Sequence, residues 1–289
     1  MLPPGTSVST ATCVIPWRHR LIARYYRAPE HPGRLRMIGW LKALLGVRVV
    51  RVEVVRGVVM DLDESDYVQR EILFHGGYEL ATLACYDALL RDARGAVDFG
   101  AHMGLYTLRA ARALAPRRGR VFAIEPTPAH AVALLHNAAL SGLRNISLCT
   151  AACSDAPALL RMIAPHKENT GGSRLANDGT DDLRAIPLHV PVRPAGELVS
   201  IIPPACLDLV KIDVEGHEFR ILRSLFAATA TRPRDIIFEF NPRDFDYGDP
   251  ATKLEWLRSE RYALCDVSGK PFVAGAQLPD ANLWAHLMH

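Results

Sequence analysis

The sequence contains no long uninterrupted apolar run. A membrane-spanning helix needs roughly 20 successive apolar residues, and the best stretch, residues 40–50, is interrupted by Lys42 and Arg48. The first thirty residues also lack the apolar segment of a secretory signal peptide, because Arg18 and Arg20 follow a start with Pro, Ser and Thr. These absences predict a cytoplasmic protein without a transmembrane helix.

Cysteine is scarce as well, and the six cysteines form no CxxC pair. Two of them, Cys149 and Cys153, fall within residues 146–153, a stretch that we predict to be a single strand. Without paired spacing there is no sign of a disulfide framework. We therefore expect reduced cysteines that serve as small core residues.

A strong overall charge is also absent, since 34 Lys and Arg stand against 31 Asp and Glu, for a net charge of +3. With 49% hydrophobic residues, a chain of 289 residues can bury a sizeable core, which excludes a disordered or collagen-like protein. The charges are nevertheless uneven, because residues 1–60 contain ten Arg or Lys and two Glu. That segment is +8 and leaves −5 for the remainder. It could attract phosphate, anionic lipid or an acidic acceptor, or be a solvated helical cap, but it contains no nucleic-acid-binding module.

Two kinds of organisation follow one another along the chain. We predict two short basic helices within residues 17–45, two strands within residues 47–60, and a helical stretch over residues 65–90 that breaks at Gly76-Gly77. From residue 95 onward, apolar runs alternate with helical segments, as a parallel sheet covered on both faces requires. The predicted strands are residues 96–100, 120–125, 146–153, 207–214 and 235–240, with two more near Tyr262 and Leu283, and the predicted helices are residues 104–114, 128–141, 217–226 and 252–259. The chain is thus predicted to be α/β, with a doubly wound sheet in residues 76–289 and a basic helical and β appendage in residues 1–75 that forms a cap or acceptor region.

One loop has the composition of a nucleotide site. Residues 97–104 (VDFGAHMG) end a predicted strand, turn on Gly100 and Gly104, and open a helix whose positive end can face a polar ligand. A dinucleotide fingerprint needs a third glycine, which is missing, and Asp98 would repel a pyrophosphate. The same carboxylate would attract the ammonium group of S-adenosylmethionine. Glu125, at the tip of the next strand, could accept hydrogen bonds from a ribose diol.

Four stretches carry a more specific resemblance. VDFGAHMGLYTL (residues 97–108), VFAIEP (residues 121–126), residues 145–155 and DLVKIDVEGHE (residues 208–218) resemble, in this order, the FkbM-type family of S-adenosylmethionine-dependent methyltransferases. The resemblance extends over about residues 75–289. It implies the class I methyltransferase fold, a Rossmann-like seven-stranded sheet with an antiparallel last strand. It also implies transfer of a methyl group to a hydroxyl in natural product or glycan biosynthesis.

The resemblance also implies which residues bind the cofactor. At the methionine end they are Asp98, Gly100, Ala101, His102 and Gly104, with Tyr106, Thr107 and Glu79 also matching; Glu125 binds the ribose; and Ala152, Ser154 and Asp155 flank the adenine. The chain departs from the family at His102, where Asn is usual, and at residues 195–198, where a helix start containing Asp is usual. Residues 167–173 match a polar loop that could close over the substrate or be an exposed loop.

Charged residues recur at the ends of two predicted strands. Lys211, Asp213 and Glu215 alternate with apolar residues, as do Glu239 and Asn241, so sheet geometry should bring them to one edge. Two mechanisms fit this arrangement. Mg²⁺ held by Asp213, Glu239 and Asn241 could lower the pKa of an acceptor hydroxyl. Alternatively, a carboxylate or His217 could act as the base, with Lys211 compensating charge. Glu215 and Glu218 also suit the first turn of any helix, and Lys211 could neutralise a buried carboxylate.

These residues predict an enzyme, an O-methyltransferase that consumes S-adenosylmethionine, with or without Mg²⁺, and modifies a sugar, a polyketide or a related small molecule. The predicted catalytic residues are Asp213, Glu239, Lys211 and His217. Two alternatives stay open: methylation of a small-molecule amine, and a non-catalytic cofactor-binding or scaffold protein of the same fold. The basic appendage favours an anionic or lipid-linked acceptor, and the oligomeric state is open, a homodimer included.

Overall fold

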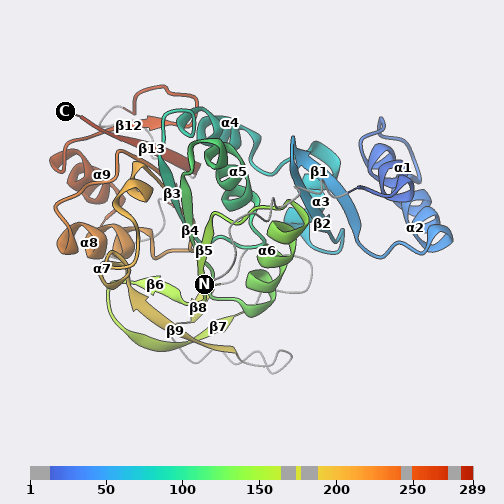
Figure 1. Cartoon of the computed structure of the whole chain (residues 1–289). Helices are drawn as coiled ribbons and strands as arrows, with labels where there is room; N and C mark the ends of the chain where they lie inside the picture. Colours follow the sequence, from blue (N-terminus) through green and yellow to red (C-terminus); the bar gives the residue numbers. More distant parts are fainter. Residues whose placement is uncertain (1–13, 164–173, 177–187, 242–248, 273–280, 289) are drawn as a thin grey trace, which may run out of the picture.

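The computed structural model describes residues 14–163, 174–176, 188–241, 249–272 and 281–288. Its centre is a seven-stranded sheet with the order β12-β13-β11-β10-β3-β4-β5 (Figure 1). The strands are β3 (Gly95–Phe99), β4 (Arg120–Ile124), β5 (Ile146–Cys149), β10 (Leu209–Ile212), β11 (Asp235–Phe240), β12 (Tyr262–Asp266) and β13 (Ala281–Leu287). Only β13 runs against its neighbours, and it is inserted between β12 and β11. The sequence order reverses between β3 and β10, which is where ligands bind in doubly wound sheets.

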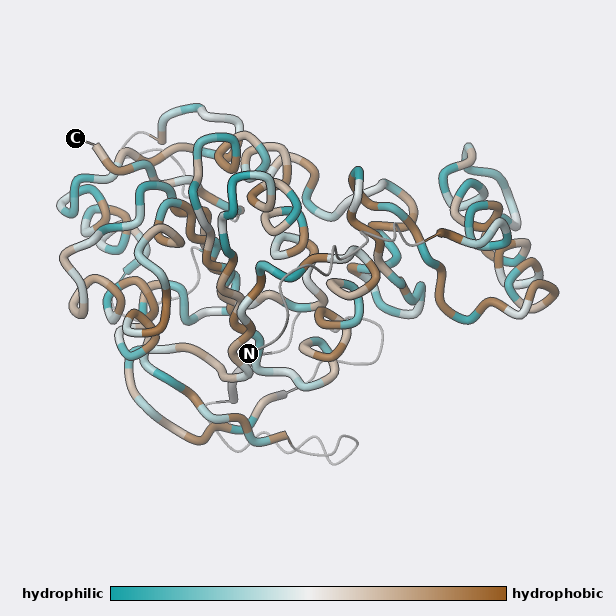
Figure 2. The backbone as a smooth tube through the Cα atoms, viewed as in Figure 1, coloured by the Kyte–Doolittle hydropathy of each residue, from teal (hydrophilic) through white to brown (hydrophobic). Residues whose placement is uncertain are grey.

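Helices cover both faces of this sheet, as the apolar strands require. On one face, Ala96 and Leu209 pack in a common core with α4 (Leu80–Leu89) and α5 (Leu105–Leu114), and α6 (Pro128–Leu140) lies beside them. On the other face, Val97 and Val210 pack with α7 (Ala195–Leu198), α8 (Glu218–Ala228) and α9 (Pro250–Ser259). Figure 2 shows the apolar character of the central strands. The predicted doubly wound sheet is therefore confirmed.

Beyond β5 the chain builds a second, smaller sheet. It has the order β6-β9-β7-β8, with β6 (Ala152–Ser154), β7 (Ala158–Ile163), β8 (Arg174–Ala176) and β9 (Leu188–Pro194). The prediction of one strand over residues 146–153 was wrong, because β5 is the edge of the large sheet and ends at Cys149, while Ala152 already pairs with Val192 of β9. The five cysteines within the described residues are free.

The first elements of the chain lie at one end of the molecule (Figure 1). They are α1 (Trp17–Tyr26), α2 (Arg34–Leu45), the hairpin β1 (Val50–Val55) and β2 (Val58–Leu62), and α3 (Tyr67–His75). The hairpin turns at Gly57, and Gly76 directly follows the last residue of α3; each glycine has a φ of +80°. These elements confirm the two strands predicted within residues 47–60 and the predicted break at Gly76-Gly77.

The appendage shares a core with the rest of the protein. Ile22, Tyr26 and Met60 belong to the same buried cluster as residues of α4 and α5. Two polar contacts also attach β2 to α6, since the backbone N–H of Asp61 donates to Asn137 Oδ1 at 3.0 Å and that of Val59 donates to Ser141 Oγ at 2.9 Å. Among the described residues, no helix is both long and apolar enough to cross a membrane.

Candidate functional site

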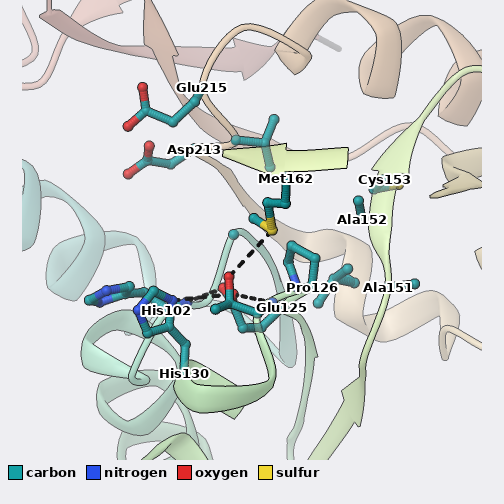
Figure 3. Close-up of a pocket in the computed structure, with 14 residues that line it drawn as sticks. His102, Glu125, Pro126, His130, Ala151, Ala152, Cys153, Met162, Asp213 and Glu215 are labelled. Atoms are coloured by element: carbon teal, nitrogen blue, oxygen red, sulfur yellow. Dashed lines mark hydrogen bonds and ion pairs between the residues drawn. The ribbon is translucent and has the colours of Figure 1, made fainter. Parts of the chain in front are cut away.

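Two adjoining hollows open where the carboxyl ends of the central strands meet. The first, which we call the β4 hollow, lies beside the end of β4 and is drawn in Figure 3. The second, the β11 hollow, lies beside the end of β11. Gly100, His102, Asp213 and Glu215 line both hollows. A ligand could therefore extend from one hollow into the other past these four residues.

The loop between β3 and α5 separates the two hollows. Gly100 has a φ of +82°, and a Cβ atom there would lie 1.8 Å from the carbonyl oxygen of Asp213, so only glycine fits. Gly104, with a φ of +98°, directly precedes the first residue of α5. The backbone N–H groups of Gly100 and Ala101 both donate to the carbonyl of Ile124 at 3.0 Å. The loop is thus held tightly across the ends of β4 and β10.

Asp98 supports the loop from inside the protein. The side chain is fully buried, and Thr107 Oγ1 donates to its Oδ2 at 2.6 Å. Its Oδ1 is buried and has no hydrogen-bond partner among the described residues. Burial raises the pKa of Asp98, whereas the nearby charge of Lys211 opposes that rise. One carboxylate oxygen is therefore available to a donor that comes from elsewhere.

Glu125 is held as a charged carboxylate at the β4 hollow. The backbone N–H groups of His102 and Thr127 donate to its two oxygens at 2.7 and 2.8 Å, and His130 Nδ1 lies 3.4 Å from Oε1 (Figure 3). Burial alone would raise the pKa of Glu125, but the contacts with His130 and the two N–H groups outweigh burial and lower it. The ring centroids of His102 and His130 are 3.9 Å apart. Burial, together with His130, lowers the pKa of His102 to about 4, so its ring is neutral at pH 7.

The remaining wall of the β4 hollow is largely apolar. Ala152 and Cys153 of β6 and Met162 of β7 line it, so the small sheet closes this side. The prediction placed Ser154 and Asp155 here as well, but neither lines the hollow. Instead, Ser154 Oγ contacts His217 Nδ1 at 2.9 Å, and Asp155 forms an ion pair with Arg220 at 3.3 Å. Those two residues attach the small sheet to α8.

The β11 hollow is built around an ion pair. Lys211 Nζ donates to Asp213 Oδ2 at 2.8 Å and lies 4.4 Å from the centroid of the Tyr106 ring. Burial alone would lower the pKa of Lys211, but Asp213 and Asp98 outweigh it and raise the pKa. The lysine is only 2% exposed. It is therefore a permanent buried cation beneath the hollow.

Glu79 joins the hollow from the turn before α4. Its φ is 52°, an uncommon conformation for a residue with a side chain. Asn282 Nδ2 of β13 donates to Glu79 Oε2 at 2.8 Å, and the Tyr106 hydroxyl donates to the same oxygen at 3.4 Å. Burial, and then the charge of Asp213, raises the pKa of Glu79. Tyr78 also lines the hollow, and burial with the charge of Glu79 raises its pKa to about 12.

Three carboxylates converge at the mouth of the β11 hollow. Asp213, Glu215 and Glu239 each offer an oxygen, and the three oxygens lie within 4.8 Å of one another. Figure 3 shows the Asp213 and Glu215 side chains pointing in the same direction. Burial, and then the charges of Asp213 and Glu215, raises the pKa of Glu239 to about 8. Asn241 directly follows β11 in the sequence. Of the residues predicted to meet at one edge, the structure thus brings Asp213, Glu215 and Glu239 together.

The strand before this cluster is shorter than predicted. β10 ends at Ile212, so Asp213 and Glu215 lie after the strand, and Glu215 has a φ of 58°. Glu218 is the first residue of α8, as one of the two predictions for it required, and it accepts hydrogen bonds from the N–H groups of Val214 and Gly216. His217, which was predicted as a possible base, lines neither hollow and is buried with its Nδ1 2.9 Å from Ser154 Oγ.

Three residues at the site were not predicted from the sequence. His130 and Met162 line the β4 hollow, and Asn282 holds Glu79. No local pattern marks them, because each reaches the site from an element whose place depends on the fold. The predicted loop at residues 167–173 lies outside the described residues.

The strand order, the single antiparallel strand β13 and the glycine loop between β3 and α5 define a class I S-adenosylmethionine-dependent methyltransferase. A comparison with protein families agrees, since the family described as methyltransferase FkbM domain matches residues 98–264. The chain belongs to this family. No curated protein matches the sequence.

Several solved structures resemble the chain. Methyltransferase FkbM from Methylobacillus flagellatus KT is 16% identical with a TM-score of 0.43, and the match covers 93% of this chain but only 58% of that one. The O-methyltransferase TomG from Streptomyces achromogenes is 15% identical with a TM-score of 0.46, covering 87% of this chain and 95% of the other. M. jannaschii TYW2, solved in complex with AdoMet, is 12% identical with a TM-score of 0.41, covering 83% and 85%.

Proposed function

We propose that this protein transfers a methyl group from S-adenosylmethionine to a hydroxyl of a sugar, a polyketide or a related small molecule in the cytoplasm. Membership of the FkbM methyltransferase family supports the reaction type. The observation that carries the proposal is Glu239, a carboxylate that lines the β11 hollow beside Asp213 and Glu215 and whose pKa is raised to about 8. An alkyl hydroxyl needs a base to become a nucleophile, and a base works best when its pKa lies near the working pH.

The residues of the β4 hollow fit the cofactor. Its apolar wall at Ala152, Cys153 and Met162 suits an adenine ring, and the charged Glu125 suits a ribose diol. Gly100 lines both hollows, so its backbone borders the path of a ligand that extends from one hollow to the other. Asp98 is buried and lines neither hollow, so its unpartnered Oδ1 would meet the ammonium group through a water. When bound, S-adenosylmethionine supplies a methyl group on a positively charged sulfur.

The residues of the β11 hollow would then prepare the acceptor. We assign the base to Glu239, because Asp213 is already engaged by Lys211. In its unprotonated form, Glu239 can accept the proton of an acceptor hydroxyl, and that proton stays on its carboxylate while the oxygen forms its new bond to carbon. Asp213 and Glu79, held by Lys211 and Asn282, can accept hydrogen bonds from other hydroxyls and so orient the acceptor. Lys211 limits the mutual repulsion of these carboxylates.

A divalent cation would offer a second way to activate the hydroxyl. Asp213, Glu215 and Glu239 present the hard oxygen donors that Mg²⁺ prefers, and Asn241 directly follows the strand that carries Glu239. Mg²⁺ at this place would lower the pKa of a bound hydroxyl, so that its proton could pass to solvent without Glu239 as the base. Activity that survives EDTA would assign the proton to Glu239, whereas activity that requires added Mg²⁺ would assign the three carboxylates to the metal.

Methylation of an amine is a second candidate, favoured by the charge of the β11 hollow. Four acidic side chains line it, from Glu79, Asp213, Glu215 and Glu239, against the one cation Lys211 among its lining residues, and Glu239 is mostly protonated at pH 7. Such a hollow attracts a protonated amine. A protonated amine must still lose a proton before it can attack, so Glu239 would serve in this reaction too.

In this proposal, as predicted from the sequence, residues 76–289 form the methyltransferase domain and residues 1–75 form the appendage. From the described part of the appendage, the β11 hollow receives Val68 of α3 and no residue of α1 or α2. The decisive experiment incubates the protein with labelled S-adenosylmethionine and panels of hydroxylated and aminated small molecules. Label on a hydroxyl oxygen supports the proposal, label on nitrogen selects the second candidate, and binding of S-adenosylhomocysteine without transfer to either panel would indicate a non-catalytic protein.

A further inference from the structure

The helices α1 and α2 carry apolar side chains that nothing in the described protein covers. Trp17 is 63% exposed, Trp40 59% and Leu44 64%, and Leu21 and Met37 are exposed as well. We call these five residues the apolar edge. The two helices lie at the end of the molecule away from the large sheet, where Figure 2 shows hydrophobic segments on both. Their exposure therefore has no explanation in the core or in either hollow.

The apolar edge follows helical spacing. On α2, Met37, Trp40 and Leu44 are separated by three and four residues, so they lie on one face, while Ile38 points from another face into the core. On α1, Trp17 and Leu21 are four residues apart and share a face as well. Each helix thus has two apolar strips, one of which is buried in the core and one of which is exposed.

A strip of arginines runs beside the apolar residues of α1. Arg20, Arg24 and Arg27 are exposed, follow one another at four- and three-residue spacing, and line a groove together with Arg51 of β1. Arg51 is paired with Asp61 at 2.7 Å, and Glu53 is the single carboxylate that lines the groove. Arg20, Arg24 and Arg27 form no ion pair with any described residue.

Two other cations of this region have visible structural roles. Lys42 of α2 pairs with Glu64 at 2.8 Å, and Arg34 lies over the ring of Phe74. These contacts attach α2 to the rest of the protein. The arginine strip of α1 has no comparable contact, so its charges face solvent and remain available to an anionic partner.

We infer that α1 and α2 dock the protein on the surface of an anionic lipid bilayer. The arginine strip and its groove would bind lipid phosphates, since a guanidinium matches phosphate geometry. The apolar edge would enter the boundary between headgroups and acyl chains, where Trp is favoured. A nucleic acid would use the arginines but would leave Leu21, Met37 and Leu44 in water. The combination of an unpaired arginine strip with an exposed apolar edge therefore favours lipid.

Vesicle flotation tests this inference on the full chain. We expect the protein to float with vesicles of 70% phosphatidylcholine and 30% phosphatidylglycerol in 0.1 M salt and to remain unbound with phosphatidylcholine alone. The double variant Arg20→Glu/Arg24→Glu should lower the partition coefficient by about tenfold or more, because each basic residue near such a surface contributes measurably. Trp40→Ser/Leu44→Ser should lower it by a similar factor and abolish part of the blue shift of tryptophan emission on binding.

Two matched variants control for general effects. Arg118→Glu/Arg144→Glu reverses two exposed charges elsewhere, and Val132→Ser/Leu135→Ser removes two exposed apolar side chains of α6. Both should float like the wild type, and all four variants should keep the wild-type melting temperature and S-adenosylhomocysteine affinity. Equal flotation with both kinds of vesicle, or equal losses in test and control variants, would overturn the inference. So would an absence of flotation at a salt concentration where the protein still binds RNA.

Discussion

Replacing Glu239 by Gln tests the proposed base, because the amide keeps the shape of the side chain but accepts no proton. A general base typically accelerates a reaction by roughly 10²–10⁴-fold, so we expect kcat to fall at least a hundredfold. Glu239 does not line the β4 hollow, and the affinity for S-adenosylhomocysteine should therefore stay within about threefold of wild type, or about 0.7 kcal/mol. Glu255→Gln, which changes an exposed glutamate of α9, is the matched control.

The pH dependence of the same variant makes the test sharper. With the pKa of Glu239 raised to about 8, about a tenth of the wild-type molecules carry the unprotonated base at pH 7. The rate should therefore rise about tenfold between pH 7 and pH 9, and the residual rate of the variant should lack this rise. Labelled S-adenosylmethionine and an accepted hydroxyl compound provide the assay.

Stability gives an independent reading that needs no acceptor. The pKa of Glu239 is higher in the folded protein than the ordinary 4.5, so folding favours the protonated form. The associated stability is fully present below pH 4.5 and is lost as pH rises through about 8. On the alkaline side, Glu239→Gln should thus be more stable than wild type by up to a few kcal/mol. A wild-type rate and pH profile in the variant, with no gain in stability at pH 9, would refute the reasoning.

Three further outcomes follow from the geometry. Gly100→Ala forces a Cβ atom into the carbonyl of Asp213, so it should abolish S-adenosylhomocysteine binding in calorimetry, whereas Gly142→Ala, where the space is open, should not; retained binding would show that the loop can move aside. Glu125→Gln should weaken that binding about tenfold, or 1.4 kcal/mol, and an unchanged Kd would remove Glu125 from the cofactor site. Lys211→Met leaves Asp213 without its partner and should cost roughly 2 kcal/mol in urea unfolding, less than for a fully buried pair because Asp213 is 31% exposed; an unchanged unfolding midpoint would mean that the ion pair contributes nothing.

The sequence predicted the sheet well because both of its faces are buried. Short apolar runs without alternation, such as residues 121–124, are typical of a parallel strand that is covered on both faces. The cofactor loop could also be predicted from the sequence, since Gly100 and Gly104, which adopt positive φ angles, are close together in the chain. The ends of strands were harder to predict. Backbone pairing rather than composition determines that β10 ends at Ile212 and that residues 146–153 are divided between two sheets.

The parts of the site that the sequence missed come from distant elements. Asn282 and Glu79 are 203 residues apart, and only the insertion of β13 beside β11 brings them together. The surroundings of His217 also depend on a distant element. Its position at a helix start beside the acidic cluster suggested catalysis, but the ring turns toward Ser154 on the small sheet, which no periodicity could place.

The position of β13 also bears on how the protein is made. This strand follows β11 and β12 in the sequence yet lies between them in the sheet, and it supplies the side chain that fixes Glu79. During synthesis, β11 and β12 emerge from the ribosome first and must remain apart until β13 arrives. A nascent chain can therefore assemble the β4 hollow early, but it completes the β11 hollow only after residue 282 has been added. The protein should acquire cofactor binding before it acquires the capacity to orient an acceptor.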